Sequence, residues 1–174
     1  MGAEATLAEL GIAIPEVVPP LAAYQPTART GNLVFTAGQL PARDGEMLAI
    51  GKLGGDVSEE QGYDCARQCA LNALAAIRAE IGSLDDIVRV VKAVVFVAST
   101  PDFTGQPKVA NGASELLGEV FGDAGKHARS AVGVTVLPLD VPVEVELVVE
   151  IRQSVEVRQS VEVGQSVEVG SNGA

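Results

Sequence analysis

A regular alternation of apolar and polar side chains marks residues 141–152 as a β-strand. Val, Leu or Ile occupies every odd position, and the even positions include Glu144, Glu146, Glu150 and Arg152. Successive side chains of a strand point to opposite faces of the sheet. The segment is therefore predicted to lie in a sheet that has one packed face and one polar face.

Three further segments are predicted to contribute to this sheet. Residues 30–41 form a strand that is entered through a Gly-Asn turn and ended by Pro41. The Val-rich segment 86–99 alternates only in part, which predicts a central strand with both faces buried. Residues 128–138 supply another apolar run, and the Asp-Gly pair within 42–54 predicts a hairpin turn.

Two helices are predicted between the strands. The first begins at Ser58, because Ser58 and Gln61 form a capping box, and it ends at Gly82. Between these ends, apolar side chains recur at spacings of three and four: Ala66, Ala70, Ala73, Leu74, Ile77 and Ile81. The second helix is predicted to begin near residue 105 and to end at residue 121. Residues 1–20 are predicted to form a short helical turn followed by a proline-bounded extended arm.

The order of these elements predicts the fold class. Strands, a helix, a strand, a helix and two strands indicate an α+β domain with a mixed sheet and two helices packed on one face. The other face is left uncovered, and an apolar face of this kind tends to pack against copies of the same chain.

In residues 153–174 the sequence QSVEV occurs three times. An extended β-ribbon, an added segment and a repeat expansion all fit this tail, and no chemistry is assigned to it.

Composition narrows the function classes. The 174 residues fit one globular domain, and the formal net charge of −11 argues against nucleic-acid partners and anionic membranes, because phosphate contacts need clustered Lys and Arg. No apolar run is close to the length of a membrane-spanning helix, which needs about 18 residues. The N-terminus lacks the pattern of a secretory signal. A cytoplasmic protein is expected. Cys65 and Cys69 are expected to be small buried residues of a reducing compartment.

Few residues are candidates for chemistry. The sequence has no phosphate-binding glycine loop, no nucleophile elbow and no metal-ligating set, so neither a metal nor a cofactor is expected. The single histidine, His127, is interpreted as a surface or turn residue. Tyr24 fits plain packing, and Asn111 fits a surface position or a bend in the second helix.

Arg129 is different, because it stands at the start of an apolar strand. A guanidinium is costly to bury there unless an anion meets it. Its planar fork matches a carboxylate through two parallel hydrogen bonds. Two explanations are open at this point: an ion pair with Glu144 or another internal acid, or a binding site for an anionic ligand.

Four segments, taken in order, resemble the Rid family, also called the YjgF-like or reactive intermediate deaminase family. They are GNLVFTAGQLP (31–41), VKAVVFVASTPDF (91–103), VANGASELL (109–117) and HARSAVGVTVLPLDVPVEVEL (127–147). The resemblance runs from about Pro19 to Arg152. It divides the chain into an N-terminal extension (1–18), a Rid-like domain (19–152) and the QSVEV-repeat tail (153–174).

The resemblance implies a chorismate-mutase-like fold and a homotrimer, with a central barrel-like core and pockets between subunits. It also implies hydrolysis of reactive enamines and imines, such as 2-aminoacrylate, to 2-oxo acids and ammonia. Arg129 matches the family's carboxylate-binding arginine, and Glu144 matches an acid that orders or deprotonates the attacking water. The pocket would be lined by the other matched positions: Tyr24, Thr36, Ala37, Gly38, Asn111 and Ser130.

Three positions depart from the family pattern. Ala37 stands where a serine is common, Ala131 where many members have a cysteine, and Gly133 where a larger residue, often Glu, is usual. The pocket is therefore expected to be roomier and less polar. An alternative function follows from these departures: a non-catalytic trimer that binds small carboxylates or regulates a partner.

Overall fold

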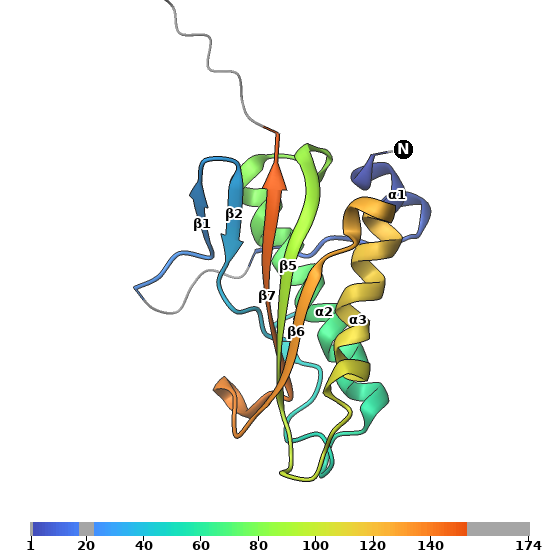
Figure 1. The fold of residues 1–174 in the computed structure, drawn as a ribbon, viewed down its shortest axis with the longest axis vertical. Helices are drawn as coiled ribbons and strands as arrows, with labels where there is room; N and C mark the ends of the chain where they lie inside the picture. Colours follow the sequence, from blue (N-terminus) through green and yellow to red (C-terminus); the bar gives the residue numbers. More distant parts are fainter. Residues whose placement is uncertain (1, 18–22, 153–174) are drawn as a thin grey trace, which may run out of the picture.

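Five strands form the central sheet: β1 (Thr27–Thr30), β2 (Leu33–Thr36), β5 (Ile87–Ala98), β6 (Ala128–Val134) and β7 (Val143–Ile151). The structure is a computed structural model that describes residues 2–17 and 23–152. The strand order is β1-β2-β7-β5-β6 (Figure 1). Strands β5 and β6 run parallel and the other neighbouring pairs run antiparallel, which confirms the predicted mixed sheet.

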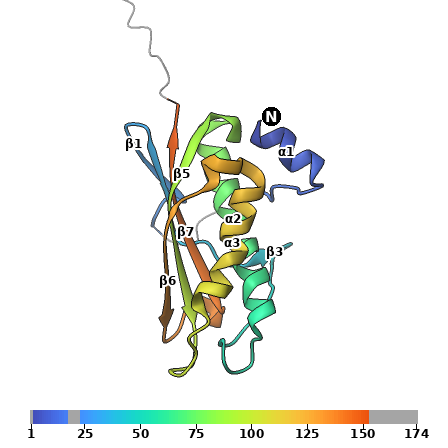
Figure 2. The same ribbon diagram turned by 45° about the vertical axis from the view of Figure 1, so that its right-hand side comes forward.

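Two long helices, α2 (Glu59–Ile81) and α3 (Gln106–Phe121), lie on the same face of this sheet, as Figure 2 shows. The predicted capping box of α2 is present: the Gln61 amide donates to Ser58 Oγ at 3.1 Å, and the Ser58 amide donates to Gln61 Oε1 at 2.9 Å. Gly82 ends the helix with a φ of 91°, a conformation that favours glycine. The α+β class with both helices on one face is therefore confirmed.

Shorter elements surround this framework. They are the helix α1 (Ala3–Glu9), the strands β3 (Ala42–Arg43) and β4 (Glu46–Met47), and the 3₁₀ turns η1 (Leu84–Asp86), η2 (Gly122–Gly125) and η3 (Pro138–Asp140). Asp44 and Gly45 join β3 to β4 with φ values of 54° and 85°, which confirms the predicted hairpin turn. Helix α1 packs near α3, and its Ala3 and Leu7 belong to the main buried cluster.

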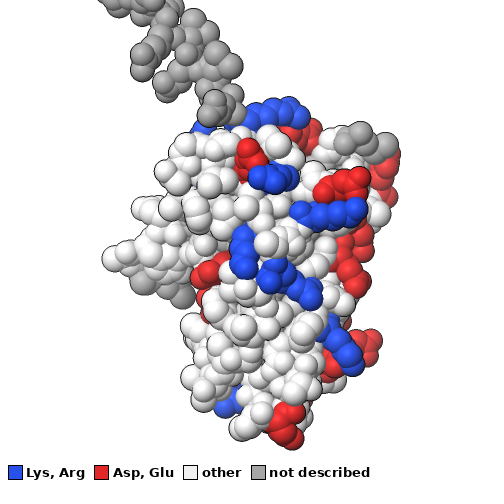
Figure 3. Space-filling view, viewed as in Figure 1, with Lys and Arg blue, Asp and Glu red and all other residues white. Residues whose placement is uncertain are grey.

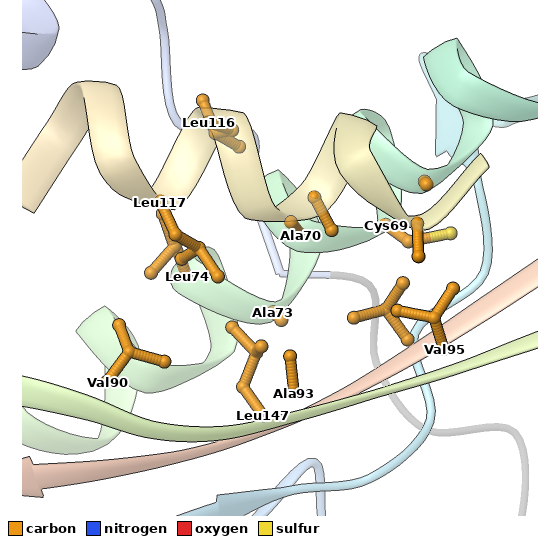
Figure 4. Packing of buried hydrophobic residues seen from close by; sticks show 14 of the residues in the cluster. Cys69, Ala70, Ala73, Leu74, Val90, Ala93, Val95, Leu116, Leu117 and Leu147 are labelled. Atoms are coloured by element: carbon orange, nitrogen blue, oxygen red, sulfur yellow. The ribbon is translucent and has the colours of Figure 1, made fainter. Parts of the chain in front are cut away.

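The core lies between the helices and the sheet and is built from aliphatic and small side chains (Figure 4). Its fully buried members include Leu74 of α2, Leu117 of α3, Val95 of β5 and Leu147 of β7. Small residues let the two helices approach each other closely. At Gly112 of α3, an added Cβ would overlap the backbone carbonyl of Tyr63 in α2. The position of α3 over the sheet therefore depends on this glycine contact.

Three sequence-based predictions about the strands are corrected. The segment 30–41 does not form one strand, because β2 ends at Thr36 and a separate strand, β1, precedes the turn. Strand β6 ends at Val134, four residues before the predicted end at residue 138. Only one face of β5 is buried within the chain: Val95 is 0% exposed, whereas Phe96, which points the other way, is partly exposed.

The second face of the sheet is apolar and partly exposed. Phe35 of β2 is 39% exposed and Val132 of β6 is 45% exposed. Viewed with the sheet in front of α2, the surface is mostly uncharged, with a few Lys and Arg side chains near its middle (Figure 3). Across the described ranges, no helix has the length and hydropathy that a membrane crossing requires. The repeat tail lies outside the described residues.

Candidate functional site

Arg129 lies near the start of β6, an edge strand of the sheet. Its register partner in the neighbouring strand β5 is Ala93, which is 0% exposed and lies beneath the helices. Residues at the same level of adjacent strands point to the same face. Arg129 therefore points toward α3, and the alternation along β6 places Ala131 on this side and Ser130 on the open side.

Helix α3 supplies the hydrogen-bond acceptors for Arg129. Nη1 donates to Asn111 Oδ1 at 2.9 Å and to Ser114 Oγ at 3.0 Å, and Nη2 donates to the Pro107 carbonyl at 3.3 Å. A guanidinium carries five N–H groups, so two of them have no acceptor among the described residues. All three acceptors are neutral, and they hold the guanidinium without cancelling its charge.

Among the residues that the structure describes, no acid forms the internal ion pair that was one explanation for Arg129. The ion pairs within residues 2–17 and 23–152 do not include Arg129. Glu144, the acid proposed as its partner, is level with Phe96 of β5 and points to the open face. The sheet therefore separates Glu144 from Arg129 within one copy of the chain.

Two residues that the sequence reasoning missed join Arg129. Ser114 Oγ lies 3.1 Å from His127 Nε2, and His127 Nδ1 lies 2.6 Å from the Gly125 carbonyl. His127 is half-buried on the loop between η2 and β6 and is hydrogen-bonded on both ring nitrogens, so the predicted surface or turn residue is a turn residue that also joins the cluster. A sequence signal did exist: Ser114 follows Asn111 by three positions on a helix, and His127 precedes Arg129 by two.

A shallow pocket of about 300 Å³ opens at this cluster. It is lined by Ser114, Gly118, Gly125, Lys126, His127 and Arg129. Lys126 is paired with Asp123 at 2.6 Å, which leaves Arg129 as the lining cation that no acid neutralises within the described chain. A small anion fits this combination of charge and size.

Glu144 belongs to a second group of predicted residues, on the open face. Its carboxylate lies against Gly38, where a Cβ would overlap it, so the close approach requires glycine. Burial raises the pKa of the Glu144 carboxyl above its ordinary value, and repulsion from Glu146 raises it further. Ser130 is on the same face, and its hydroxyl accepts a hydrogen bond from Lys92 Nζ at 2.8 Å.

The remaining predicted residues are Thr36 and Ala37, which directly precede Gly38 in the chain, and Tyr24. Thr36 is 8% exposed, and its hydroxyl accepts a hydrogen bond from the Leu147 amide at 3.0 Å, so it supports the sheet. Ala37 continues the same segment, and its amide donates to the Pro26 carbonyl at 2.8 Å. Tyr24 is 51% exposed on the segment before β1. One copy of the chain brings Arg129 and Asn111 together but does not assemble the whole predicted set.

Comparison with known proteins places the chain in a family. The family described as "YjgF/chorismate mutase-like, putative endoribonuclease" matches residues 4–151. The chain belongs to the YjgF-like, or Rid, family. Its fold is thereby shown to be of the YjgF and chorismate-mutase-like type, as expected from the four segments.

Three Rid relatives illustrate the range of the family. The chain is 43% identical over 143 residues to protein TCP17 of Trypanosoma cruzi, covering 82% of this chain and 89% of the relative. A solved structure of protein Atu1372 from Agrobacterium tumefaciens, of unknown function, is 42% identical, with a TM-score of 0.81 and coverage of 86% and 92%. A 2-iminobutanoate/2-iminopropanoate deaminase of Dermatophagoides farinae is 29% identical over 139 residues, covering 79% and 92%.

Gly133, one of the three departures from the Rid pattern, lines a different pocket from Arg129. A Cβ there would lie 2.9 Å from both Gln106 Nε2 and Ser99 Oγ. Both atoms are the ends of flexible side chains, and these residues line a pocket of about 500 Å³ together with Gly133, so the expectation of a roomier, less polar pocket remains a prediction. Ala131 packs against the core.

In the part of this Rid protein that the structure describes, the cysteines and the acidic residues form no metal site. Within the described residues, no three His, Cys, Asp or Glu side chains gather closely enough to hold a metal ion. Cys65 and Cys69 are both free and buried. Burial raises the pKa of the Cys65 thiol to about 11 and raises that of Cys69 well above its ordinary value. Both thiols are therefore protonated and poor nucleophiles at neutral pH.

Proposed function

We propose that the protein hydrolyses reactive 2-imino acids and their enamine forms, such as 2-aminoacrylate, to 2-oxo acids and ammonia. The observation that carries this proposal is the Arg129 guanidinium, which three neutral acceptors hold beside a small pocket and which no acid of the described chain neutralises. The deaminase among the family's relatives supports the same substrate class.

Arg129 would bind the substrate carboxylate. Its two remaining N–H groups can donate to the carboxylate oxygens, and such charge-assisted hydrogen bonds contribute about 1.5–3 kcal/mol each. Binding at this end fixes the imine carbon beside the pocket. An imine carbon is already electrophilic, so its hydrolysis needs only a positioned water and help with proton transfer. No metal or cofactor enters the proposal.

We infer that a second copy completes the site. Glu144, the acid expected to order the water, is on the opposite face of the sheet from Arg129. It can therefore meet an Arg129 side chain only when that side chain comes from another copy. The partly exposed apolar face that carries Glu144 is a suitable contact surface, and a homotrimer is the proposed assembly.

A coupled assay tests this function. A threonine or serine dehydratase supplies the intermediate, and the release of 2-oxobutanoate or pyruvate is followed with and without the protein. Arg129→Ala should reduce the acceleration to background, whereas Arg29→Ala, an exposed arginine whose Nε donates to the Gly31 carbonyl at 3.2 Å, should leave it unchanged. Equal rates for the wild type and Arg129→Ala would show that Arg129 does not bind the substrate.

Subunit complementation tests the two-copy site. Arg129→Ala and Glu144→Gln chains are each expected to be inactive alone. When they are co-expressed, mixed assemblies contain sites that combine the intact Arg129 of one chain with the intact Glu144 of the other, and part of the activity should return. Mixtures that stay inactive, although mixed oligomers form, contradict a site shared between copies.

A second candidate is a non-catalytic protein that binds small carboxylates. The separation of Glu144 from Arg129 within the chain favours it, as does the alanine at position 131. Titration calorimetry with 2-oxobutanoate would then show saturable binding that Arg129→Ala removes, without turnover in the coupled assay. A nucleic-acid substrate, as the family's description suggests, is disfavoured by the formal net charge of −11.

We also propose a reducing compartment such as the cytoplasm. Cys65 and Cys69 are one helical turn apart in α2, and both remain free thiols within the core. Free buried cysteines of this kind are typical of reducing surroundings. Fractionation of the expressing cells would test the location.

A further inference from the structure

When His127 is neutral, the hydrogen bonds around Ser114 fix the direction of each proton in the cluster. Arginine can only donate, so Ser114 Oγ accepts from Arg129 Nη1. The Gly125 carbonyl can only accept, so His127 Nδ1 carries a proton toward it. In the neutral imidazole, Nε2 is then an acceptor, and the Ser114 hydroxyl donates to it across 3.1 Å. Ser114 Oγ keeps one lone pair that can face a ligand.

The same geometry also satisfies the protonated imidazole. In that state His127 Nε2–H donates to Ser114 Oγ, while Nδ1–H still donates to Gly125. The Ser114 hydroxyl is then released and can donate toward the pocket. The two states differ by one proton and one hydroxyl rotation, and neither state leaves a donor facing a donor.

The Gly125 carbonyl, which orients the His127 ring, is held in place by packing. Gly125 is buried, and a Cβ on it would overlap the Leu117 carbonyl of α3 and lie 3.0 Å from the Gly118 amide. The backbone at Gly125 therefore sits directly on the helix that carries Ser114. Ser114, His127 and Arg129 consequently approach one another with little freedom to shift, as an acid–base site requires.

We propose that Ser114 and His127 form the acid–base pair of the Arg129 site, an inference that rests on the proposed function. Ser114 contacts the attacking water, and His127 acts through Ser114. In this arrangement Ser114 and His127 take up and return the water proton beside Arg129, while Glu144 of a second copy orders the water.

The proton transfers balance over the reaction. The substrate enters as the protonated imine, C=NH₂⁺. As the water oxygen bonds to its carbon, the π electron pair of the C=N bond moves to nitrogen, one water proton passes to Ser114 Oγ, and the Ser114 proton passes to His127 Nε2. The product of this step is a carbinolamine. His127 then returns its proton through Ser114 to the amine nitrogen, the C–N bond breaks, and an oxygen lone pair forms the carbonyl. The hydroxyl proton leaves with ammonia as ammonium.

Kinetics of four variants in the coupled assay test the pair. Ser114→Ala and His127→Gln should each lower kcat by roughly 100-fold, as expected when an acid–base group is lost, with KM within about threefold of the wild type because Arg129 still binds the carboxylate. Glutamine keeps an oxygen that can accept from Ser114 but cannot carry the proton. His127→Ala should regain part of its kcat when imidazole is added, which a merely structural role would not give. Glu115→Gln is the control, because Glu115 is exposed and accepts from the Tyr63 hydroxyl at 2.7 Å.

A second measurement does not depend on turnover. The chain has one histidine, so ¹⁵N-histidine labelling gives the signals of a single imidazole. The neutral ring should be protonated on Nδ1, and both 2-oxobutanoate and Ser114→Ala should shift the Nε2 resonance. A neutral ring protonated on Nε2 overturns the proposed proton directions.

The outcomes separate the two hypotheses. An active wild type with both variants within about threefold of its kcat overturns the acid–base pair and leaves the proposed function intact. A wild type without activity refutes the proposed function, and the pair with it. An active wild type, the two losses in kcat and rescue by imidazole together support the pair.

Discussion

The substitution Gly112→Ala should destabilise the protein although alanine is the better helix former. Gly112 lies inside α3, where it packs on the backbone of α2. A Cβ at this position would overlap the Tyr63 carbonyl and lie 3.1 Å from the Arg67 amide. Both atoms belong to helix backbone, which cannot rotate away as a side chain can. The helices would have to separate, and the core beneath them would open.

The expected magnitude follows from two opposing contributions. Overpacking a closely packed interior costs about 1–3 kcal/mol, and a clash with backbone belongs at the upper end of this range. Alanine is favoured over glycine in a helix interior by about 1 kcal/mol. The free energy of unfolding should therefore fall by about 2 kcal/mol.

Gly118→Ala provides a matched control in the same helix. A Cβ at Gly118 would meet no atom within 4 Å, so only the helix preference applies, and stability should rise by about 0.5–1 kcal/mol. Urea unfolding followed by circular dichroism, at one protein concentration, gives both values. If the two substitutions change stability in the same direction, the packing at Gly112 does not set the distance between the helices.

Two further predictions follow from titratable groups. Burial and Glu146 raise the pKa of Glu144 in the folded chain, so Glu144 contributes stability below its unfolded pKa that is lost as the pH rises through the folded value. Glu144→Gln should accordingly raise the urea midpoint at pH 7 and change it little at pH 3.5. An equal effect at both pH values would contradict the burial of Glu144. The pKa of Cys65 is raised to about 11, that of Cys69 is also raised, and both thiols are buried. Iodoacetamide at pH 8 should therefore leave both cysteines unmodified in the folded protein and label both in urea. Rapid labelling without urea would show that the thiols are not held in the core.

Local patterns predicted much of the fold because their causes are local. The alternation in β7 is matched by side chains that are buried at every odd position from Val143 to Ile151. The capping box at Ser58 and the glycine at position 82 gave the ends of α2. Strand β1 was missed because its four residues, TART, show no alternation and are mostly exposed. Its place in the sheet comes from pairing with β2 rather than from a hydrophobic face.

The prediction for β5 failed for a different reason. Its sequence is apolar on both faces, which is the pattern of a strand covered on two sides. Within the chain, the helices cover one side, and Phe96 and Val94 on the other side stay partly exposed. Periodicity reports how apolar each face is, but it does not say whether the cover comes from the same chain.

The candidate site was predicted only in part, because its members meet through tertiary packing. Arg129 stood out since a charged residue in an apolar run is visible in the sequence itself. The spacing of Ser114 from Asn111 and of His127 from Arg129 was only a weak signal. Ser114 and His127 are 13 residues apart, and their contact depends on where α3 crosses β6 and on the buried turn at Gly125. A hydroxyl on a helix and a histidine in a loop become a pair only when that crossing is known.

The separation of Arg129 from Glu144 follows from counting positions along the sheet. Arg129 is level with Ala93, which in turn is level with Leu147 of β7. Glu144 precedes Leu147 by three positions, and an odd offset along a strand reverses the face. A one-residue change of register between β5 and β7 would bring both side chains to one face, but it would also expose the buried positions of β7 together. The core thus fixes which groups surround Arg129 within its own chain, and any contribution from Glu144 requires a second copy.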